Sequence, residues 1–139
     1  MNTTTFSLLV VDDDEDDRLI INDAFRELGY ESQVKKFVNG KKLLAYLEQI
    51  ERSQYPSLIV LDNTLPDLNA EDILDILKSN KDFQTIPVVV YTTSLSPGKK
   101  ETLLEKGVHQ CYKKEDVMEK IVQVARELKQ IAESNNTPT

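Results

Sequence analysis

Acidic side chains directly follow two of the apolar runs in this chain. Asp12 and Asp13 come after Leu8–Val11, and Asp62 comes after Leu58–Leu61. Carboxylates gathered within a few ångströms repel one another by about 1 kcal/mol per pair in water and by about 4 kcal/mol at an effective dielectric constant of about 20. A hard dication relieves this repulsion, and Mg²⁺ prefers a few carboxylates together with water and phosphate oxygens. The three acids therefore predict a Mg²⁺ site if the fold brings them together.

A hydroxyl and an ammonium follow two later strand candidates. Thr92 comes after the run 87–91, and Lys114 comes after the run 108–113. Such groups can hold the oxygens of a phosphoryl group, and an aspartate can accept that group as an aspartyl-phosphate. Because Asp62 stands alone after its strand, we predict that it is the nucleophile.

The elements that must position these residues are short strands alternating with helical segments. Three runs are continuously apolar, as expected of strands buried on both faces, and two are mixed, as expected at sheet edges. Apolar residues at helical spacing lie between them, so the alternation predicts an α/β fold with right-handed crossovers and helices on both faces. The order 2-1-3-4-5 places the mixed strands at the edges, which is the flavodoxin-like doubly wound (βα)5 arrangement with ligands at the carboxyl ends of the strands. The predicted strands are 6–11, 33–38, 58–61, 87–91 and 108–113.

In these features the chain resembles the receiver domains of response regulators in two-component signalling. The resemblance covers residues 5–132 and depends on four motifs in the expected order, namely LLVVDD, LIVLDNTLPDLNA, IPVVVYTTS and the stretch from Gly107 to Lys114. The spacings from Asp62 to Thr92 and from Asp62 to Lys114 are also those expected of the family. Residues 133–139 are predicted to form a disordered polar tail.

The resemblance implies a role for each site residue. Asp62 would be the phosphorylation site, Thr92 the switch hydroxyl, and Lys114 the ammonium that pairs with phosphate. The phosphoryl group would come from a histidine kinase or a phosphotransfer protein. The Mg²⁺ ligands would be the carboxylates of Asp12, Asp13 and Asp62 and the backbone carbonyl of Thr64.

Output is expected through docking of an unidentified partner, on the face formed by 95–108 and Tyr112. The chain would not be an enzyme beyond self-phosphorylation from small donors and autodephosphorylation. Two alternatives stay open. One is a small phosphohydrolase with an aspartyl nucleophile, although Thr64 stands where such an enzyme has a second acid. The other is a degenerate receiver that binds partners without phosphorylation.

Three positions depart from the family pattern. Glu115 follows Lys114 where proline is usual, often with a cis bond, and this bears on the aim of the lysine side chain. Cys111 occupies the place of an aromatic switch residue, and its neighbour Tyr112 must face the opposite side of the strand. We therefore expect the coupling of the switch threonine to an aromatic ring to be altered. Ala70 in place of glycine is a mild change.

The acids that follow Asp13 have a simpler interpretation. Residues 14–17 are predicted to form a solvated helix N-terminus, where carboxylates favour the helix dipole. A calcium-binding loop is disfavoured because Asp17 stands at the position that requires glycine.

Composition sets the remaining bounds. The 139 residues predict one domain. A net charge of −7, from 17 basic and 24 acidic residues, disfavours nucleic-acid binding. The single cysteine excludes an internal disulfide, and no apolar stretch approaches the length of a membrane span. We expect a cytoplasmic protein that is a monomer or weak dimer and does not bind membranes.

Overall fold

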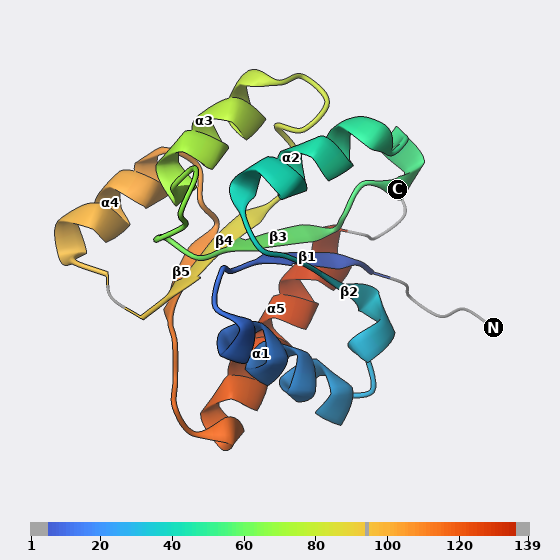
Figure 1. Cartoon of the computed structure of the whole chain (residues 1–139), viewed down its shortest axis with the longest axis vertical. Helices are drawn as coiled ribbons and strands as arrows, with labels where there is room; N and C mark the ends of the chain where they lie inside the picture. Colours follow the sequence, from blue (N-terminus) through green and yellow to red (C-terminus); the bar gives the residue numbers. More distant parts are fainter. Residues whose placement is uncertain (1–5, 94, 136–139) are drawn as a thin grey trace.

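Five parallel strands form one sheet in the order β2-β1-β3-β4-β5 (Figure 1). In this computed structural model, residues 6–93 and 95–135 are described. The register places Val11 beside both Phe37 and Leu61, so these strands end at the same level. The predicted fold and strand order are confirmed. The strands are β1 Leu8–Val11, β2 Val34–Phe37, β3 Leu58–Leu61, β4 Val88–Thr92 and β5 Gln110–Lys113.

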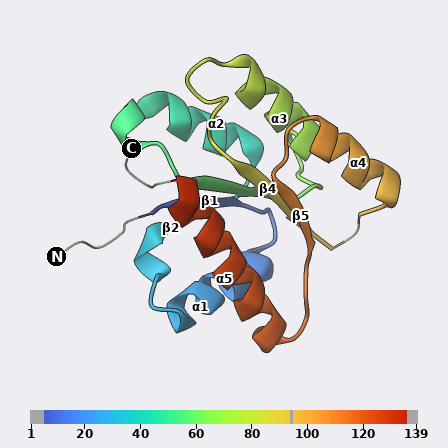
Figure 2. The ribbon, with the colours of Figure 1, turned by 180° about the vertical axis from the view of Figure 1, so that it is seen from behind.

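Helices cover both faces of the sheet. Figures 1 and 2 show α1 and α5 on one face and α2, α3 and α4 on the other. Each face therefore has its own hydrophobic core, one centred on residues such as Phe25 and Leu128 and the other on residues such as Leu43 and Ile73. The helices are α1 Glu15–Glu27, α2 Gly40–Gln49, α3 Ala70–Ser79, α4 Pro97–Glu105 and α5 Met118–Asn135, with short 3₁₀ turns at Glu31–Gln33 and Arg52–Gln54.

Polar side chains fix where the helices begin. Asp14, Asn39, Asn69 and Ser96 each precede a helix, and each side chain accepts a hydrogen bond from a backbone N–H in the first turn. Such caps satisfy donors that would otherwise lack a partner at a helix N-terminus. The loops at the carboxyl edge of the sheet therefore end at defined points.

The C-terminal helix is longer than the sequence predicts. It continues to Asn135, so the tail predicted for 133–139 is wrong over 133–135, and the rest of that tail lies outside the described residues. Ala132 is fully buried, and Lys129 forms an ion pair with Glu133 one turn later at 3.1 Å. Packing and this pair extend the helix beyond its apolar stripe. No helix among the described residues is both long and apolar enough to cross a bilayer.

Candidate functional site

The loops after β1 and β3 bring the predicted metal-binding acids together. Asp62 N donates to the Val11 carbonyl at 3.0 Å, so the two loops leave the sheet side by side. One carboxylate oxygen from each of Asp12, Asp13 and Asp62 lies within 4.8 Å of the other two. Asp12 and Asp62 are buried, whereas Asp13 is exposed. A small cluster of carboxylates open to solvent on one side suits a hard divalent cation that keeps some of its water.

The Asp62 carboxylate is held by two neighbouring segments. It is 8% exposed, and its Oδ1 accepts a hydrogen bond from the Thr92 hydroxyl at 3.0 Å. The backbone N–H of Thr64 donates to the same oxygen at 3.3 Å. Thr92 is the last residue of β4, the strand next to β3, so the parallel register brings this hydroxyl to Asp62. The Thr64 carbonyl as a metal ligand stays a prediction.

Lys114 reaches into the centre of the site. Its ammonium donates to Asp12 Oδ2 at 2.6 Å, to Asp17 Oδ2 at 2.7 Å and to Asp62 Oδ2 at 3.2 Å. The side chain is 8% exposed. Its backbone N–H donates to the Thr92 carbonyl at 2.8 Å, which extends the β4–β5 pairing by one residue. Glu115 in place of proline therefore does not turn the lysine away from the acids.

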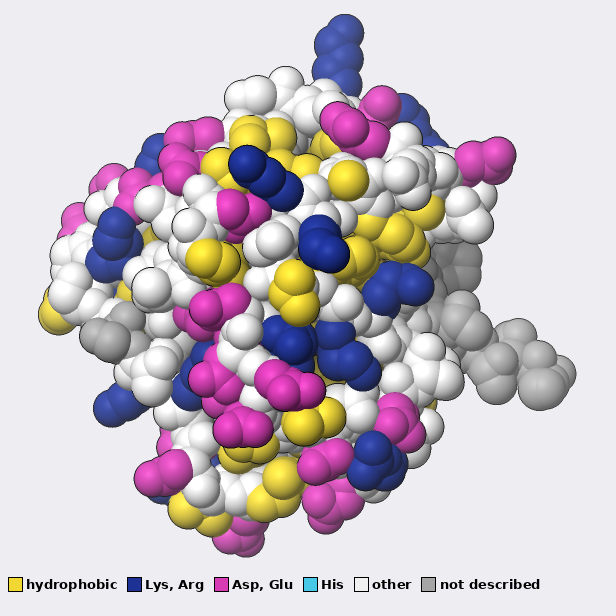
Figure 3. Space-filling model, in the orientation of Figure 1, with side chains coloured by type: hydrophobic (Ala, Val, Ile, Leu, Met, Phe, Trp, Pro, Cys, Tyr) yellow, Lys and Arg dark blue, Asp and Glu magenta, His cyan; other side chains and the backbone are white. Residues whose placement is uncertain are grey.

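Burial and charge pairing oppose each other at these groups. Burial disfavours the Lys114 ammonium, but hydrogen bonds to Asp12 and Asp17 outweigh it and raise the pKa of Lys114 above its ordinary value. Burial raises the pKa of Asp12, and the hydrogen bonds from Lys114 and from the Asp14 N–H only partly offset this effect. Three carboxylates, those of Asp12, Asp17 and Asp62, hold this one ammonium, and Asp13 lies beside two of them, so acidic groups outnumber basic ones and the cluster attracts cations. In the space-filling view, acidic side chains gather over the start of α1 (Figure 3).

Asp17 is a member of this cluster that the sequence interpretation missed. We predicted that residues 14–17 would be solvated, and this holds for Asp14, which is exposed and caps α1. The Asp17 side chain is instead 34% exposed and pairs with Lys114. The signal was its place in the first turn of the helix that begins at the carboxyl edge of the sheet, where an inward-facing acid meets the site.

A hollow lies beside Cys111, the position where the resemblance led us to expect an aromatic side chain. The cysteine is buried, and burial raises the pKa of its thiol. The hollow has a volume of about 480 Å³ and lies at the carboxyl ends of β4 and β5. The residues that line it are Thr93, Leu95, Lys100, Cys111 and Lys113.

Tyr112 does not take over the place of that aromatic ring. It packs against the core under α1 and α5, whereas Cys111 belongs to the core under α2, α3 and α4. Burial and the nearby Glu127 carboxylate raise the pKa of Tyr112 to about 12. The expected separation of these two side chains onto opposite faces of β5 is confirmed.

Three acids, a threonine and a lysine meet at the carboxyl edge of this doubly wound parallel sheet. This arrangement is typical of a class of proteins that accept a phosphoryl group on an aspartate. The model of the response regulator receiver domain family matches residues 8–126, and the chain belongs to this family. The chain is therefore a receiver domain of two-component signalling, from a family of phosphoacceptors.

Relatives of known sequence agree with this assignment. The chain is 33% identical over 93 residues to the probable methanogenesis regulatory protein FilR2 of Methanothrix harundinacea, covering 66% of this chain and 60% of that protein. It is 32% identical over 90 residues to the response regulator Rcp1 of Synechocystis, covering 63% of this chain and 61% of that protein. The matched regions thus span about 60% of the length of these two relatives.

Solved structures share the same fold. The phosphorylated cyanobacterial phytochrome response regulator RcpA superimposes with a TM-score of 0.83 at 24% identity, covering 97% of this chain and 99% of that one. The Mn²⁺-bound form of Rcp1 superimposes with a TM-score of 0.76 at 24% identity, covering 96% and 97%.

Proposed function

We propose that this receiver accepts a phosphoryl group on Asp62 from a histidine kinase or a histidine phosphotransfer protein. The observation that carries the proposal is that a hydroxyl and an ammonium both reach the Asp62 carboxylate. Thr92 ends β4 and Lys114 follows β5 directly, and the Thr92 hydroxyl and the Lys114 ammonium both donate hydrogen bonds to Asp62. A hydroxyl and an ammonium in these places suit the oxygens of a phosphoryl group.

The transfer is a substitution at phosphorus. An oxygen of the Asp62 carboxylate forms a bond to phosphorus while the bond from phosphorus to the donor's imidazole nitrogen breaks. The electron pair of that bond returns to the nitrogen, and the imidazole leaves neutral if its other nitrogen carries a proton. Thr92 and Lys114 then hold oxygens of the new phosphoryl group. The added charge would draw both side chains inward and shift a pre-existing equilibrium of the α4–β5–α5 face.

The acids at the site fit Mg²⁺, which we propose as the cofactor. Asp12, Asp13, Asp62 and the Thr64 carbonyl would hold the ion. When bound, Mg²⁺ neutralises charge on the carboxylates and on the phosphoryl oxygens. The cluster of three carboxylates within 4.8 Å supports this proposal, and the relative Rcp1 is known in a Mn²⁺-bound form.

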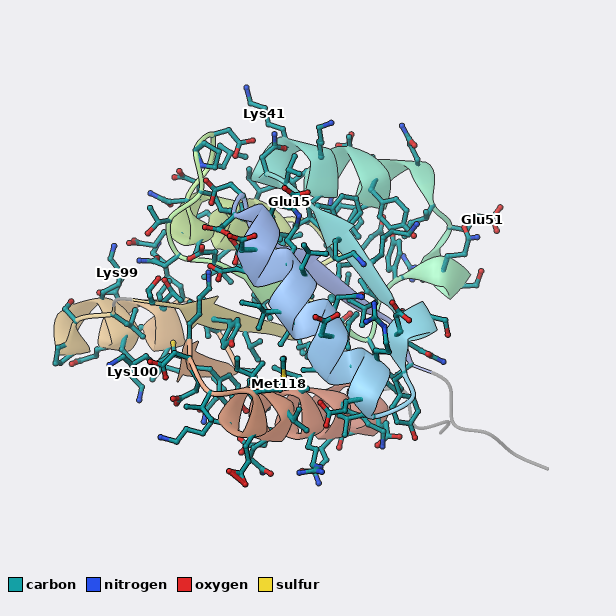
Figure 4. The ribbon with its side chains drawn as sticks, turned by 60° about the horizontal axis from the view of Figure 1, so that its bottom comes forward. Glu15, Lys41, Glu51, Lys99, Lys100 and Met118 are labelled. Atoms are coloured by element: carbon teal, nitrogen blue, oxygen red, sulfur yellow. The ribbon has the colours of Figure 1, made fainter. Side chains whose placement is uncertain are left out.

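The phosphodonor is proposed to dock beside α1 and the start of α5. A phosphohistidine must approach Asp62 closely, so the donor must cover the surface around the cleft. Leu19 and Val117 are about half exposed there, and Ile20 and Met118 are also exposed. Figure 4 shows α1 and α5 side by side, with Met118 at the start of α5. These apolar side chains give a protein donor a surface to bury.

The output partner is proposed to bind the face formed by 95–108 and Tyr112, of which α4 lies in the opposite layer and Tyr112 lies on the side of the sheet covered by α1 and α5. Leu104 on α4 is exposed, and the hollow at Cys111 opens beside Lys100. Figure 4 shows Lys99 and Lys100 on opposite sides of α4. Lys99 pairs with Glu71 of α3, which leaves Lys100 on the side of the hollow.

Incubation with acetyl phosphate and Mg²⁺, followed by intact-mass measurement, tests the acceptor. We expect a labile phosphoryl adduct on the wild-type chain, and we expect no adduct on Asp62→Asn or when EDTA replaces Mg²⁺. Asp16→Asn, which changes an exposed acid outside the cluster, is the matched control and should still be labelled. An adduct that persists on Asp62→Asn would show that another residue is the acceptor.

An extension of the same experiment separates the two alternative functions. We propose stoichiometric acceptance and not turnover of a phosphate ester. A parallel assay with a phosphate ester is needed for the first alternative, because a receiver also releases phosphate slowly when its aspartyl-phosphate hydrolyses. Steady turnover of the ester would indicate a phosphohydrolase. A folded wild-type chain that never acquires phosphate would indicate a phosphorylation-independent interaction module.

A further inference from the structure

Asp17 holds the same ammonium as the two buried acids of the site. Its carboxylate lies 2.7 Å from Lys114 Nζ, closer than the 3.2 Å between Nζ and Asp62. A lysine ammonium has three N–H donors, and the three acceptors Asp12, Asp17 and Asp62 use all of them. The Asp17 backbone is itself fixed, because its N–H donates to the Asp14 side chain at 3.1 Å in the helix cap.

The three acceptors of Lys114 are not equivalent. Asp12 and Asp62 belong to the three-carboxylate cluster that fits a divalent cation, whereas Asp17 lies outside that cluster. A cation on Asp12 and Asp62 would compete with the ammonium for the same oxygens and would repel it. Of the three carboxylates that hold Lys114, only Asp17 would then keep its hydrogen bond to the ammonium.

We propose that Asp17 is a positioning residue that retains Lys114 at the site when Asp12 and Asp62 bind Mg²⁺. This inference rests on the proposed function of Asp62. Asp17 acts through the lysine and does not touch the phosphoryl group. Without Asp17, the ammonium depends on the two metal ligands, so it competes more strongly with Mg²⁺ and is less well placed for an incoming phosphoryl oxygen.

Isothermal titration of the metal-free chain with Mg²⁺ alone measures this effect. We expect Asp17→Asn to weaken Mg²⁺ binding about fivefold more than Asp16→Asn does, a size typical of coupling between groups in direct contact. Asp16→Asn removes the same charge from an exposed neighbour in the same turn, so it corrects for long-range electrostatics. In a Lys114→Met background, the two asparagine variants should weaken Mg²⁺ binding equally.

Two results of this titration would overturn the inference. If Asp17→Asn and Asp16→Asn have equal effects in the wild-type background, Asp17 is an ordinary surface charge. If Asp17→Asn retains its excess effect in the Lys114→Met background, Asp17 does not act through the lysine. Thermal unfolding monitored by circular dichroism verifies that each variant is folded.

Phosphorylation by acetyl phosphate at saturating Mg²⁺ gives a second readout. We expect a slower rate for Asp17→Asn, no change for Asp16→Asn and partial rescue by Asp17→Glu, which restores the carboxylate. An unchanged rate for Asp17→Asn would contradict the positioning role. If the wild-type chain takes no phosphoryl group at all, the proposed function fails, while the Mg²⁺ titration still reports on the coupling between Asp17 and Lys114.

Discussion

At the residue scale, the contact between Thr92 and Asp62 joins a switch candidate to the proposed acceptor. Thr92 is 2% exposed, and its hydroxyl donates to a carboxylate that is itself buried. A buried hydrogen bond to a charged group contributes more to stability than a solvent-exposed one, because loss of its donor leaves the carboxylate poorly solvated. Thr92 therefore contributes to stability in the unphosphorylated state as well as to any response.

Replacing this hydroxyl with a methyl group tests that contribution. We expect Thr92→Val to lower the free energy of unfolding by about 1–2 kcal/mol, whereas Thr92→Ser keeps the donor and should lose less. Urea unfolding followed by circular dichroism measures both. A valine variant as stable as the wild-type chain would show that the hydrogen bond contributes nothing.

The site residues were predictable to different degrees. Asp12, Asp13, Asp62, Thr92 and Lys114 each lie at or just beyond the end of a strand, and parallel strands bring their carboxyl ends to one edge of the sheet. Asp17 was missed because acids in the first turn of a helix are usually solvated, and its place on the helix that begins at the carboxyl edge of the sheet was the one weak signal. Its contact depends on where a lysine 97 residues later in the chain is aimed.

At the element scale, Asp67 ties the loop that carries the acceptor to a neighbouring helix. This loop follows β3, and the Asp67 carboxylate accepts hydrogen bonds from the first backbone N–H groups of α2, from Gly40 at 3.1 Å and from Lys41 at 2.9 Å. Partial burial of Asp67 opposes ionisation, but the backbone N–H groups outweigh it and lower the pKa of this carboxyl below its ordinary value. The loop is thereby anchored away from the site itself.

Because the folded-state pKa of Asp67 is depressed, its contribution to stability is present at neutral pH and is lost as pH falls below the ordinary value of 3.8. We expect Asp67→Asn to lower the free energy of unfolding by about 1 kcal/mol at pH 7. The difference from the wild-type chain should shrink between about pH 4 and the acid transition. Unfolding measured across pH checks this, with Asp16→Asn as the control; a difference that does not change with pH would contradict the assignment.

The elements themselves were largely predictable. Continuously apolar strands were placed in the centre of the sheet and mixed strands at its edges, as observed for β2 and β5. The end of α5 was misjudged, because residues 133–135 carry no apolar stripe and the helix is extended by packing and by an ion pair.

At the scale of the whole molecule, the sheet separates two cores, and the site lies at the edge where both layers meet. Lys114 and Asp17 connect the site to α1 and the start of α5, whereas Thr92 leads into the loop before α4. Ion pairs of Lys99 with Glu71 and of Lys106 with Asp75 also join α4 to α3. The Asp62 carboxylate is thus connected to both layers of helices.

Nuclear magnetic resonance of the chain mixed with an unphosphorylated histidine phosphotransfer protein tests which layer receives the donor. We expect resonances of α1 and the start of α5, including those of Leu19 and Val117, to shift, while those of α4 do not. Resonance shifts centred on α4 in this unphosphorylated mixture would contradict the proposal that the donor docks on α1 and the start of α5.

The division of the molecule by its sheet has a consequence for timing. A donor seated over α1 and the part of a target that contacts α4 would lie on opposite sides of the five-stranded sheet, and the two proteins would compete only where the output face continues to Tyr112 and α5. A target could then begin to engage α4 before the donor leaves, and the lifetime of the signal would depend on how long the phosphoryl group survives on Asp62.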